Sequence, residues 1–321
     1  MKQDRLSRRR FVAASGAALG AVLLAGRQVG AAATSNEQAG PFRYSLNTST
    51  IRGQKLGLEK EIDTAAEAGY DAIEPWVSTI QEYMKAGGKL ADVRKRVEDR
   101  GLTVEGAISF TQWIVDDDAR RADALKQAKR EMDMLAQIGG KRIAAPPVGA
   151  NGNDAPILDL AKVAERYRAL LELGDRMGVT PGLELWGSSK NLHRLGQCAF
   201  VLVESGHPKA CLVGDVYHIY KGGSDFAGLK MLSAEAMPVM HMNDYPADPP
   251  RERIGDRDRV MPGDGIAPLS QILRTLRDNG SRAVLSLELF SQVYWQKDAM
   301  EVARTGLAKM KAAVEKSFGT T

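Results

Sequence analysis

Cysteine and histidine are scarce in this chain: its 321 residues include two cysteines and four histidines. So few thiol and imidazole groups argue against a thiolate-type zinc site and against a cluster of several histidine-bound metal ions. Cys198 lies in a predicted helix, and Cys211 opens a predicted strand. A disulfide between them remains open, because it requires Cα atoms within about 7 Å of each other, which a sequence does not show.

The chain also lacks an apolar run long enough for a good transmembrane helix, since its N-terminal run is short and rich in Gly and Ala. That run follows the core SRRRFV with its Arg8–Arg9 pair, and the small residues of 31–33 come after it. This layout is typical of a secretory signal, and the core resembles a twin-arginine (Tat) signal. We therefore expect residues 1–33 to be a cleaved Tat signal peptide. The expected partner during export is the Tat translocon, and the expected location of the mature protein is the periplasm.

The chain has no surplus of basic over acidic residues once the expected signal peptide is left out. Residues 1–33 carry six of the 44 basic residues and one of the 40 acidic residues, so the remaining chain has a net charge of −1. A chain of this charge lacks the basic surface that nucleic acid requires. No linker rich in Pro or Ser divides residues 34–321, and we expect them to form one domain.

Short apolar segments that alternate with amphipathic stretches dominate the remaining sequence. Eight parallel strands, each followed by a helix, are typical of a (β/α)₈ TIM barrel. An open, doubly wound α/β sheet is the alternative, but no Gly-rich fingerprint follows the first strand. The predicted strands are 43–47, 70–76, 102–108, 141–146, 180–186, 210–215, 238–243 and 283–289.

Helix faces and helix ends are also visible in the pattern. Leu58, Ile62 and Ala65 share one face of a predicted helix, and similar apolar faces recur over 125–135 and 160–171. The glycines in 138–140, in 173–174 and in 205–208 predict helix ends. Residues 244–266 show no periodicity, and a loop of that length usually carries function or is disordered.

Four polar residues interrupt the C-terminal halves of the last four predicted strands: Glu184, Asp215, His241 and Glu288. Any one alone is more often a helix cap, an ion-pair member or a core histidine. Reactive groups of a barrel gather at these strand ends, however, and three carboxylates facing one another would repel. A divalent cation removes that repulsion, so the pattern indicates a metal site. Such a shell favours Mn²⁺, with Mg²⁺, Co²⁺ or Zn²⁺ as alternatives.

The motifs GYDAIEPW, GLELWG, GDVYH, HMND, PGDG and LELF resemble, in this order, the xylose isomerase-like superfamily and its sugar phosphate isomerase/epimerase proteins. The resemblance covers residues 42–316. It implies that Glu184, Asp215, His241 and Glu288 are the metal ligands, and that the two glutamates also move the proton in catalysis. It further implies that His218 contacts a substrate hydroxyl and that Phe290 walls the sugar pocket.

The chain departs from the family's ketose epimerases at two positions. This chain has Lys190 at the position where those enzymes share a glutamate, and it has Tyr245 at the position where they have an arginine. A cation from the long loop is the expected replacement, supplied by Arg253, Arg257 or Arg259, with Arg259 as our candidate for substrate binding. We also take Glu74, which ends the second predicted strand, and Trp113, which follows a strand end, as candidate substrate contacts. The alternatives are a salt bridge for Glu74 and core or rim packing for Trp113.

The expected activity is proton abstraction next to a carbonyl, giving an enediolate, by an exported sugar isomerase or epimerase. Because phosphorylated sugars are scarce outside the cytoplasm, we expect an unphosphorylated sugar or keto-sugar. Two alternatives remain: a 3-keto-glycoside lyase or hydratase on the same scaffold, and a non-catalytic periplasmic sugar-binding protein. DNA repair of the endonuclease IV type is rejected, because it requires more histidines and a basic face. A homo-oligomer remains open.

Overall fold

The computed structural model describes residues 42–319, and the predicted signal segment lies outside them. Eight parallel strands form one curled sheet in the order β3-β2-β1-β8-β7-β6-β5-β4. Their bounds are β1 Arg43–Asn47, β2 Ala72–Glu74, β3 Thr103–Val104, β4 Arg142–Ala145, β5 Thr180–Glu184, β6 Leu212–Asp215, β7 Val239–Met242 and β8 Val284–Leu287. All eight predicted strands are therefore confirmed, each shorter than its apolar segment or equal to it.

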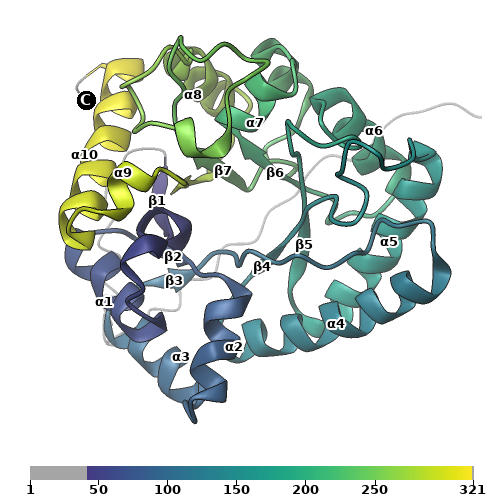
Figure 1. Cartoon of the computed structure of the whole chain (residues 1–321), viewed down its shortest axis with the longest axis horizontal. Coiled ribbons are helices and arrows are strands. Elements are labelled where there is room, and N and C mark those ends of the chain that lie inside the picture. The colour runs from purple at the N-terminus through teal and green to yellow at the C-terminus, as the bar shows by residue number, and fades with distance from the viewer. Residues whose placement is uncertain (1–41, 320–321) are drawn as a thin grey trace, which may run out of the picture. The chain divides into compact units, whose positions relative to one another are not determined.

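The two edge strands meet and close the barrel. The backbone N–H of Lys141 donates to Val104 O, that of Ala107 to Arg142 O, and that of Ala144 to Ala107 O. Figure 1 shows β3 and β4 side by side, within the ring of strands. The predicted (β/α)₈ barrel is confirmed, and the doubly wound alternative is excluded by this closure.

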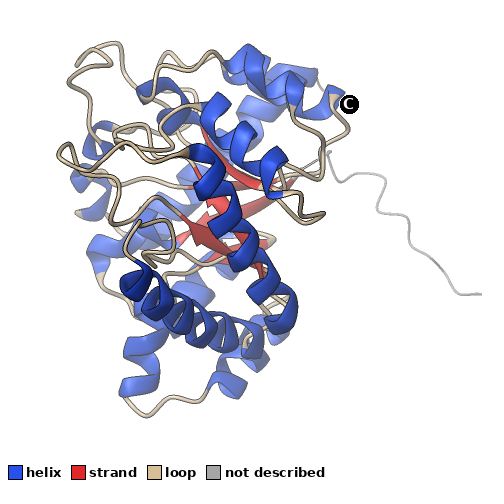
Figure 2. Cartoon of the chain, turned by 90° about the vertical axis from the view of Figure 1, so that its right-hand side faces the viewer, coloured by secondary structure: helices blue, strands red, loops and turns tan. Residues whose placement is uncertain are grey.

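Helices cover the outside of the sheet, so that the strands lie within a helical shell (Figure 2). The strands are thus covered by helices on one face and by the opposite strands of the barrel on the other. Because both faces are buried, the strands read as nearly continuous apolar runs in the sequence. The helices are α1 Leu58–Ala68, α2 Val77–Lys85, α3 Leu90–Asp99, α4 Asp118–Gln137, α5 Leu160–Met177, α6 Leu195–Ser205, α7 Val216–Lys221, α8 Leu269–Asp278, α9 Gln292–Trp295 and α10 Ala299–Phe318, with the 3₁₀ helices η1 Thr48–Gln54, η2 Phe226–Met231 and η3 Asp256–Asp258. No helix among residues 42–319 is long and apolar enough to cross a membrane.

The helix faces agree with the sequence, but one predicted helix end does not. Leu58, Ile62 and Ala65 are buried as predicted. The prediction that a helix ends at 173–174 is wrong, because α5 continues to Met177 and is capped by Gly178. Gly174 instead lies where α5 approaches β5 closely: a Cβ there would be 2.5 Å from Val179 O. The glycine serves close packing at this point and does not terminate the helix.

The two cysteines are unpaired. Cys198 in α6 and Cys211 before β6 are both buried and free. Burial raises the pKa of Cys211 to about 11, and it raises the pKa of Cys198 further above the usual range of a thiol. Cys198 and Cys211 therefore form no disulfide in this structure.

A buried carboxylate holds the N-terminal end of the barrel together. Glu105, just after β3, accepts hydrogen bonds from Arg43 Nη1 and Lys141 Nζ, both at 2.6 Å, and from Thr103 Oγ1 at 2.8 Å. Burial opposes ionisation of Glu105, but these partners, Lys141 first, outweigh it and lower the pKa to about 2. The ionised carboxylate therefore stabilises the fold.

We predict that Glu105→Gln removes a pH-dependent part of the stability. Because the folded pKa lies below the unfolded value of 4.5, the stabilisation is complete above pH 4.5 and is lost as the pH falls toward 2. The difference corresponds to about 3 kcal/mol. Urea unfolding between pH 7 and pH 3 measures it. The exposed Glu172→Gln variant is the control, and equal pH dependence in wild type and Glu105→Gln would contradict the assignment.

Candidate active site

The C-terminal ends of four neighbouring strands bring the four predicted ligands together. Glu184 ends β5, Asp215 ends β6, His241 lies in β7, and Glu288 follows β8. The parallel register places Asp215 opposite His241. The N–H of Glu288 donates to Met242 O at 3.1 Å, which extends the ladder by one residue. All four side chains are at most 3% exposed.

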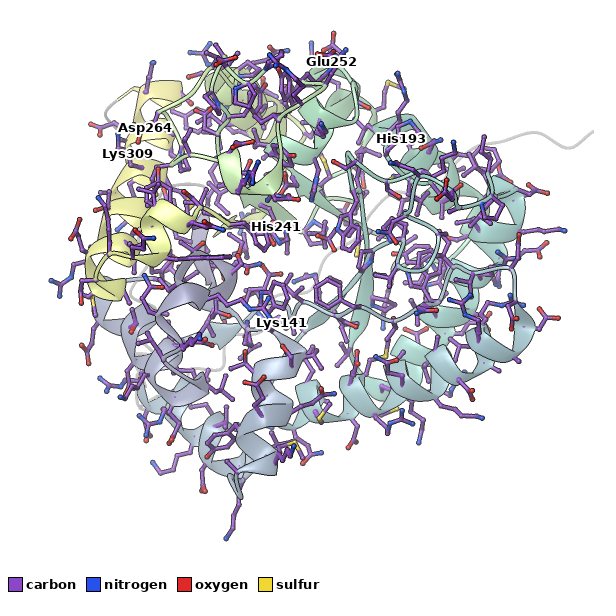
Figure 3. The ribbon with its side chains drawn as sticks, viewed as in Figure 1. Lys141, His193, His241, Glu252, Asp264 and Lys309 are labelled. Atoms are coloured by element: carbon purple, nitrogen blue, oxygen red, sulfur yellow. The ribbon has the colours of Figure 1, made fainter. Side chains whose placement is uncertain are left out.

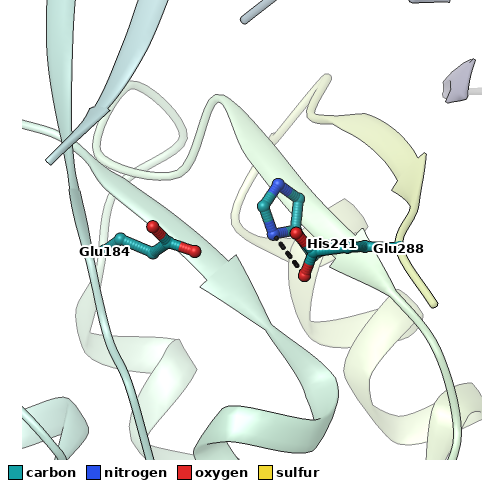
Figure 4. Close-up of side chains that lie close together, drawn as sticks. All are labelled: Glu184, His241 and Glu288. Atoms are coloured by element: carbon teal, nitrogen blue, oxygen red, sulfur yellow. Dashed lines mark ion pairs between the residues drawn. The ribbon is translucent and has the colours of Figure 1, made fainter. Parts of the chain in front are cut away.

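Three of these side chains form one compact cluster. Glu184, His241 and Glu288 each offer a ligand atom, and these atoms all lie within 4.8 Å of one another. Figure 4 shows Glu184 facing His241 and Glu288 across the gap between them. In Figure 3, His241 lies near the centre of the molecule, whereas Asp264 and Lys309 pair at its edge.

His241 makes contacts on both sides of its ring. Its Nε2 lies 3.0 Å from Glu74 Oε2, and its Nδ1 lies 3.2 Å from Glu288 Oε2 and 3.8 Å from Asp215 Oδ2. Burial works against the charged imidazole, yet Glu288 and Glu74 raise the pKa of His241 well above its usual range. The ring therefore lies in a strongly negative environment.

Asp215 accepts hydrogen bonds from three donors and is the N-cap residue of α7. Its Oδ1 accepts the backbone N–H of His218 at 2.7 Å, as an N-cap does. Its Oδ2 accepts Asn243 Nδ2 and Arg259 Nη1, both at 3.1 Å. Asp215 thus adjoins the compact cluster of three and is tied to it through Arg259.

The two candidate catalytic glutamates lie in different electrostatic surroundings. Burial, followed by the charge of Glu288, raises the pKa of Glu184 to about 8. For Glu288, burial is outweighed by His241 and then by Arg259, and its pKa is lowered. A pair of carboxyl groups with separated pKa values is the usual arrangement for acid–base chemistry.

The residues of the cluster fit a divalent cation. Glu184 Oε2 and His241 Nδ1 are buried atoms without a hydrogen-bond partner in the described part of the chain. Buried polar atoms of this kind are rare, because each loses its hydration without compensation. A cation between Glu184, His241 and Glu288 would satisfy both atoms, and two carboxylates with one imidazole are suitable ligands for Mn²⁺ or Zn²⁺.

Of the three arginines considered in the long loop, the structure brings Arg259 into the site. Arg259 is 1% exposed, and its Nη1 donates to Glu288 Oε2 at 2.8 Å as well as to Asp215. Its Nη2 contacts Asp256 and lies 3.0 Å from His218 Nε2. Arg253 and Arg257 are exposed. Tyr245, at the position of the family's arginine, stacks on Tyr220 with ring centroids 3.8 Å apart.

A cavity of about 320 Å³ opens above the cluster. Its floor is polar, with Glu184, Glu288, Arg259 and His218, and its walls are aromatic. Trp76 lies 5.1 Å from Phe110 and 6.3 Å from Phe290, and Phe110 lies 6.2 Å from Trp186, as measured between ring centroids. Burial lowers the pKa of His218 to about 4, so this imidazole is neutral at pH 7. The remaining lining residues are Ile108, Asn151, Ser188, Ser189 and Asp256.

Two predicted substrate contacts lie elsewhere. Glu74 does not line the cavity and instead contacts His241, as described above. Trp113 is fully buried, donates Nε1–H to Pro146 O at 2.9 Å and packs against Tyr167. These two residues had a salt bridge and core packing as their alternatives, and the structure places them in those surroundings. His218 and Phe290, in contrast, line the cavity as expected.

Sequence reasoning missed Phe110, Asn151 and Asp256. Phe110 follows the predicted strand 102–108 by two residues, and this position at a strand end was an available signal. Asp256 carries no such signal, because its role depends on contact with Arg259 three residues later. Asn151 lies in an irregular segment between β4 and α5, where no periodicity indicates its direction.

An eight-stranded barrel with carboxylates and a histidine at successive strand ends defines the class of α/β-barrel enzymes with a metal-type site. The chain belongs to the xylose isomerase-like TIM barrel family, whose model matches residues 62–313. It is similar to the inosose isomerase of Bacillus velezensis, with 25% identity over 83% of this chain and 95% of the relative. The fructoselysine 3-epimerase of Escherichia coli O157:H7 is 23% identical over 82% of this chain and 96% of the relative.

Other relatives and solved structures extend the comparison. The 3-dehydroshikimate dehydratase of Pseudomonas putida is 22% identical over 84% of this chain and 41% of the relative. A crystal structure of an IOLI protein with a binding zinc atom superimposes with a TM-score of 0.79, at 22% identity, over 87% of this chain and all of that one. An L-ribulose 3-epimerase structure gives a TM-score of 0.70 at 19% identity, over 86% and 95% of the two chains. These structures establish the shared fold.

We predict that Arg259→Met destabilises the protein by about 3–5 kcal/mol, the usual cost of leaving buried charges without their partner. Its removal would leave Asp215 and Glu288 without their shared guanidinium. Urea unfolding in the presence of a chelator measures the change. Arg257→Met, whose side chain is 80% exposed two residues away, is the matched control. Equal stability of the two variants would show that Arg259 does not neutralise the cluster.

Proposed function

We propose that the protein is a metal-dependent isomerase or epimerase that acts on an unphosphorylated keto-sugar or cyclic polyol ketone. The observation that carries the proposal is the pairing of Glu184 and Glu288 about His241, directly below an aromatic-walled cavity. Relatives named as an inosose isomerase and a fructoselysine 3-epimerase support this reaction class.

Glu184, His241 and Glu288 would hold the cation, with Asp215 beside them. When bound, a divalent cation polarises a substrate carbonyl and makes the neighbouring C–H more acidic. We propose Mn²⁺ because the donors are mainly oxygen atoms, while the zinc in the similar IOLI structure makes Zn²⁺ the first alternative. The buried atoms Glu184 Oε2 and His241 Nδ1, which lack partners in the described residues, support this placement.

The two glutamates would carry the proton. Glu184 ends β5 and Glu288 follows β8, and they face each other across the site, so they would approach a substrate carbon from different sides. One removes the proton next to the carbonyl and the other returns it. Return to the opposite face of the same carbon is epimerisation, whereas return to the adjacent carbon is isomerisation. His218, neutral at pH 7, is placed to accept or donate a hydrogen bond with a substrate hydroxyl.

The lining of the cavity supports a neutral substrate. Arg259 is the one Lys or Arg side chain that lines it among the described residues, and its guanidinium is already engaged by Asp215, Asp256 and Glu288. A phosphate group would therefore find no free cation there. The aromatic walls suit the apolar C–H face of a sugar or cyclitol ring, and a volume of about 320 Å³ suits a ligand of one ring.

Elimination is the second candidate reaction. A proton taken by Glu184 or Glu288 can be followed by loss of a β-oxygen substituent, as in a 3-keto-glycoside lyase or hydratase. The observation that favours it is the similarity to 3-dehydroshikimate dehydratases, which covers 84% and 86% of this chain for the two relatives. Both reactions begin with the same proton abstraction.

We predict that the Mn²⁺-loaded protein exchanges a C–H next to a carbonyl with solvent deuterium. A panel of free ketoses, inosose-like ketones and 3-keto-glycosides, incubated in D₂O and followed by NMR, identifies the substrate and the product. Glu184→Gln and Glu288→Gln should each lower turnover by roughly 10²-fold at saturating Mn²⁺, the usual scale for a positioned base.

Glu131→Gln is the control for that experiment, because Glu131 is also buried and hydrogen-bonded but belongs to α4. It should retain wild-type turnover. Tight binding of one panel member without deuterium exchange or product would favour the sugar-binding protein over the enzyme.

We also propose that the protein is exported by the Tat route and acts in the periplasm. The proposal rests on the SRRRFV core and the apolar run that follows it. A periplasmic location agrees with a neutral substrate, because phosphorylated sugars are cytoplasmic metabolites. These residues lie outside the part of the chain that the structure describes.

We predict that replacing Arg8 and Arg9 by lysine retains the uncleaved precursor in the cytoplasm. Immunoblots of periplasmic and cytoplasmic fractions measure the distribution, and Arg5→Lys, outside the twin-arginine pair, is the control. Undiminished periplasmic protein in the double variant would refute Tat export and leave the proposed enzymatic activity untouched.

A further inference from the structure

Glu74, at the end of β2, is a buried carboxylate that does not line the cavity. We propose that Glu74 is a positioning residue: it holds the His241 ring so that Nδ1 is presented to the candidate metal site with its lone pair free. This inference rests on the proposed function, since it assigns the group that orients one of the proposed ligands.

Three hydrogen-bond donors from three strands converge on a single oxygen of Glu74. Its Oε2 lies 3.0 Å from Asn47 Nδ2 of β1, 2.8 Å from Ser286 Oγ of β8 and 3.0 Å from His241 Nε2 of β7. Each of these side chains is at most 3% exposed. An oxygen that receives three donors is firmly placed, so the direction of the His241 ring is firmly placed as well.

This contact decides which nitrogen of His241 carries the proton. The amide Nδ2 of Asn47 can only donate, so Glu74 Oε2 acts as an acceptor toward its neighbours. The 3.0 Å contact with His241 therefore requires a proton on Nε2. In the neutral imidazole the lone pair then lies on Nδ1, the atom that faces Glu288 Oε2 at 3.2 Å and lacks a hydrogen-bond partner among the described residues.

Asn47 links this arrangement to the other side of the cluster. Its Nδ2 also donates to Glu288 Oε1 at 3.2 Å, while its Oδ1 accepts the N–H of Ser49 at 3.0 Å. One amide thus touches both Glu74 and a proposed ligand. The segment that follows β3 leaves room for the carboxylate: a Cβ at Gly106 would be 2.7 Å from Glu74 Oε1.

An ordinary buried ion pair would explain the contact between Glu74 and His241. It would not explain why Glu74 contacts Nε2, the ring nitrogen that faces away from the other proposed ligands. A carboxylate that receives the second N–H of a metal-binding histidine fixes its orientation and raises its basicity, and loss of such a partner typically costs about 10–100-fold in metal affinity. Glu74 stands in this relation to His241, on the side of the ring away from Glu288.

The test compares metal affinity in three proteins by titration calorimetry with Mn²⁺ and Zn²⁺. Glu74→Ala removes the acceptor and should weaken binding by about 10–100-fold. Glu74→Gln keeps an oxygen for the three donors and loses the charge, so its affinity should fall between those of wild type and Glu74→Ala. Glu105→Gln, a change of a buried carboxylate at the opposite end of the barrel, should bind metal as wild type does.

A second readout follows the histidine itself. The chain has four histidines, so ¹⁵N-histidine labelling gives a simple NMR spectrum. Wild type should show a slowly exchanging Nε2–H signal for His241 and a metal-dependent shift at Nδ1, with His241→Gln used for assignment. In Glu74→Ala the Nε2–H signal should exchange rapidly or disappear, whereas a merely destabilised but folded protein would retain it.

The outcomes separate this inference from the proposed function. Failure of wild type to bind any divalent cation refutes the metal-dependent function. Wild-type binding together with unchanged affinity and an unchanged Nε2–H signal in Glu74→Ala overturns the positioning role alone. If Glu74→Ala does not fold, Glu74→Gln decides: wild-type affinity together with rapid Nε2–H exchange in that variant overturns the role of Glu74.

Discussion

Burial of negative charge at the C-terminal end of the barrel is the constraint on which the site depends. Four carboxylates, Glu74, Glu184, Asp215 and Glu288, are each at most 3% exposed. Such groups are costly to remove from water unless charges and donors compensate them. His241 lies between Glu74 and Glu288, and Arg259 bridges Asp215 and Glu288. For Glu184, burial and the charge of Glu288 outweigh the opposing effect of His241, and its pKa is raised to about 8.

The long loop between β7 and α8 delivers the compensating cation. Asp244 anchors this loop by accepting the backbone N–H groups of Tyr245, Gly263 and Ala267. A pair of backbone hydrogen bonds between Asp244 and Val260 then fixes the segment directly next to Arg259. A segment without helical or strand periodicity is therefore ordered by hydrogen bonds within the loop, and contacts with α7 add to them: Tyr217 Oη donates to Ile254 O and Lys221 Nζ to Arg251 O.

The cavity has a charged floor and aromatic walls, and these two parts have different roles. Its floor holds the charges and the two glutamates, whereas its walls are aromatic and offer contact area without charge. Arg259 contacts both parts, because its guanidinium lies 5.0 Å from the ring of Phe290 in the wall and also donates to Glu288 in the floor. A substrate ring held by the walls would present its polar edge to the floor, which is the geometry that proton transfer next to a carbonyl requires.

The sequence by itself determined the eight strands, the barrel and the residues at the strand ends. Two local signals carry this information: the alternation of apolar segments with amphipathic stretches, and the polar residue near the end of an apolar run. Gly174 shows the limit of such signals, since a glycine that ends a helix and one that permits close packing look alike in a sequence. The tertiary structure alone decided that Arg259 rather than Arg253 or Arg257 enters the site. It also decided that Glu74 contacts His241 across 167 residues of chain, while Trp113 packs in the core. These outcomes depend on which side chains from distant strands share one buried volume, and only the closed barrel brings those side chains together.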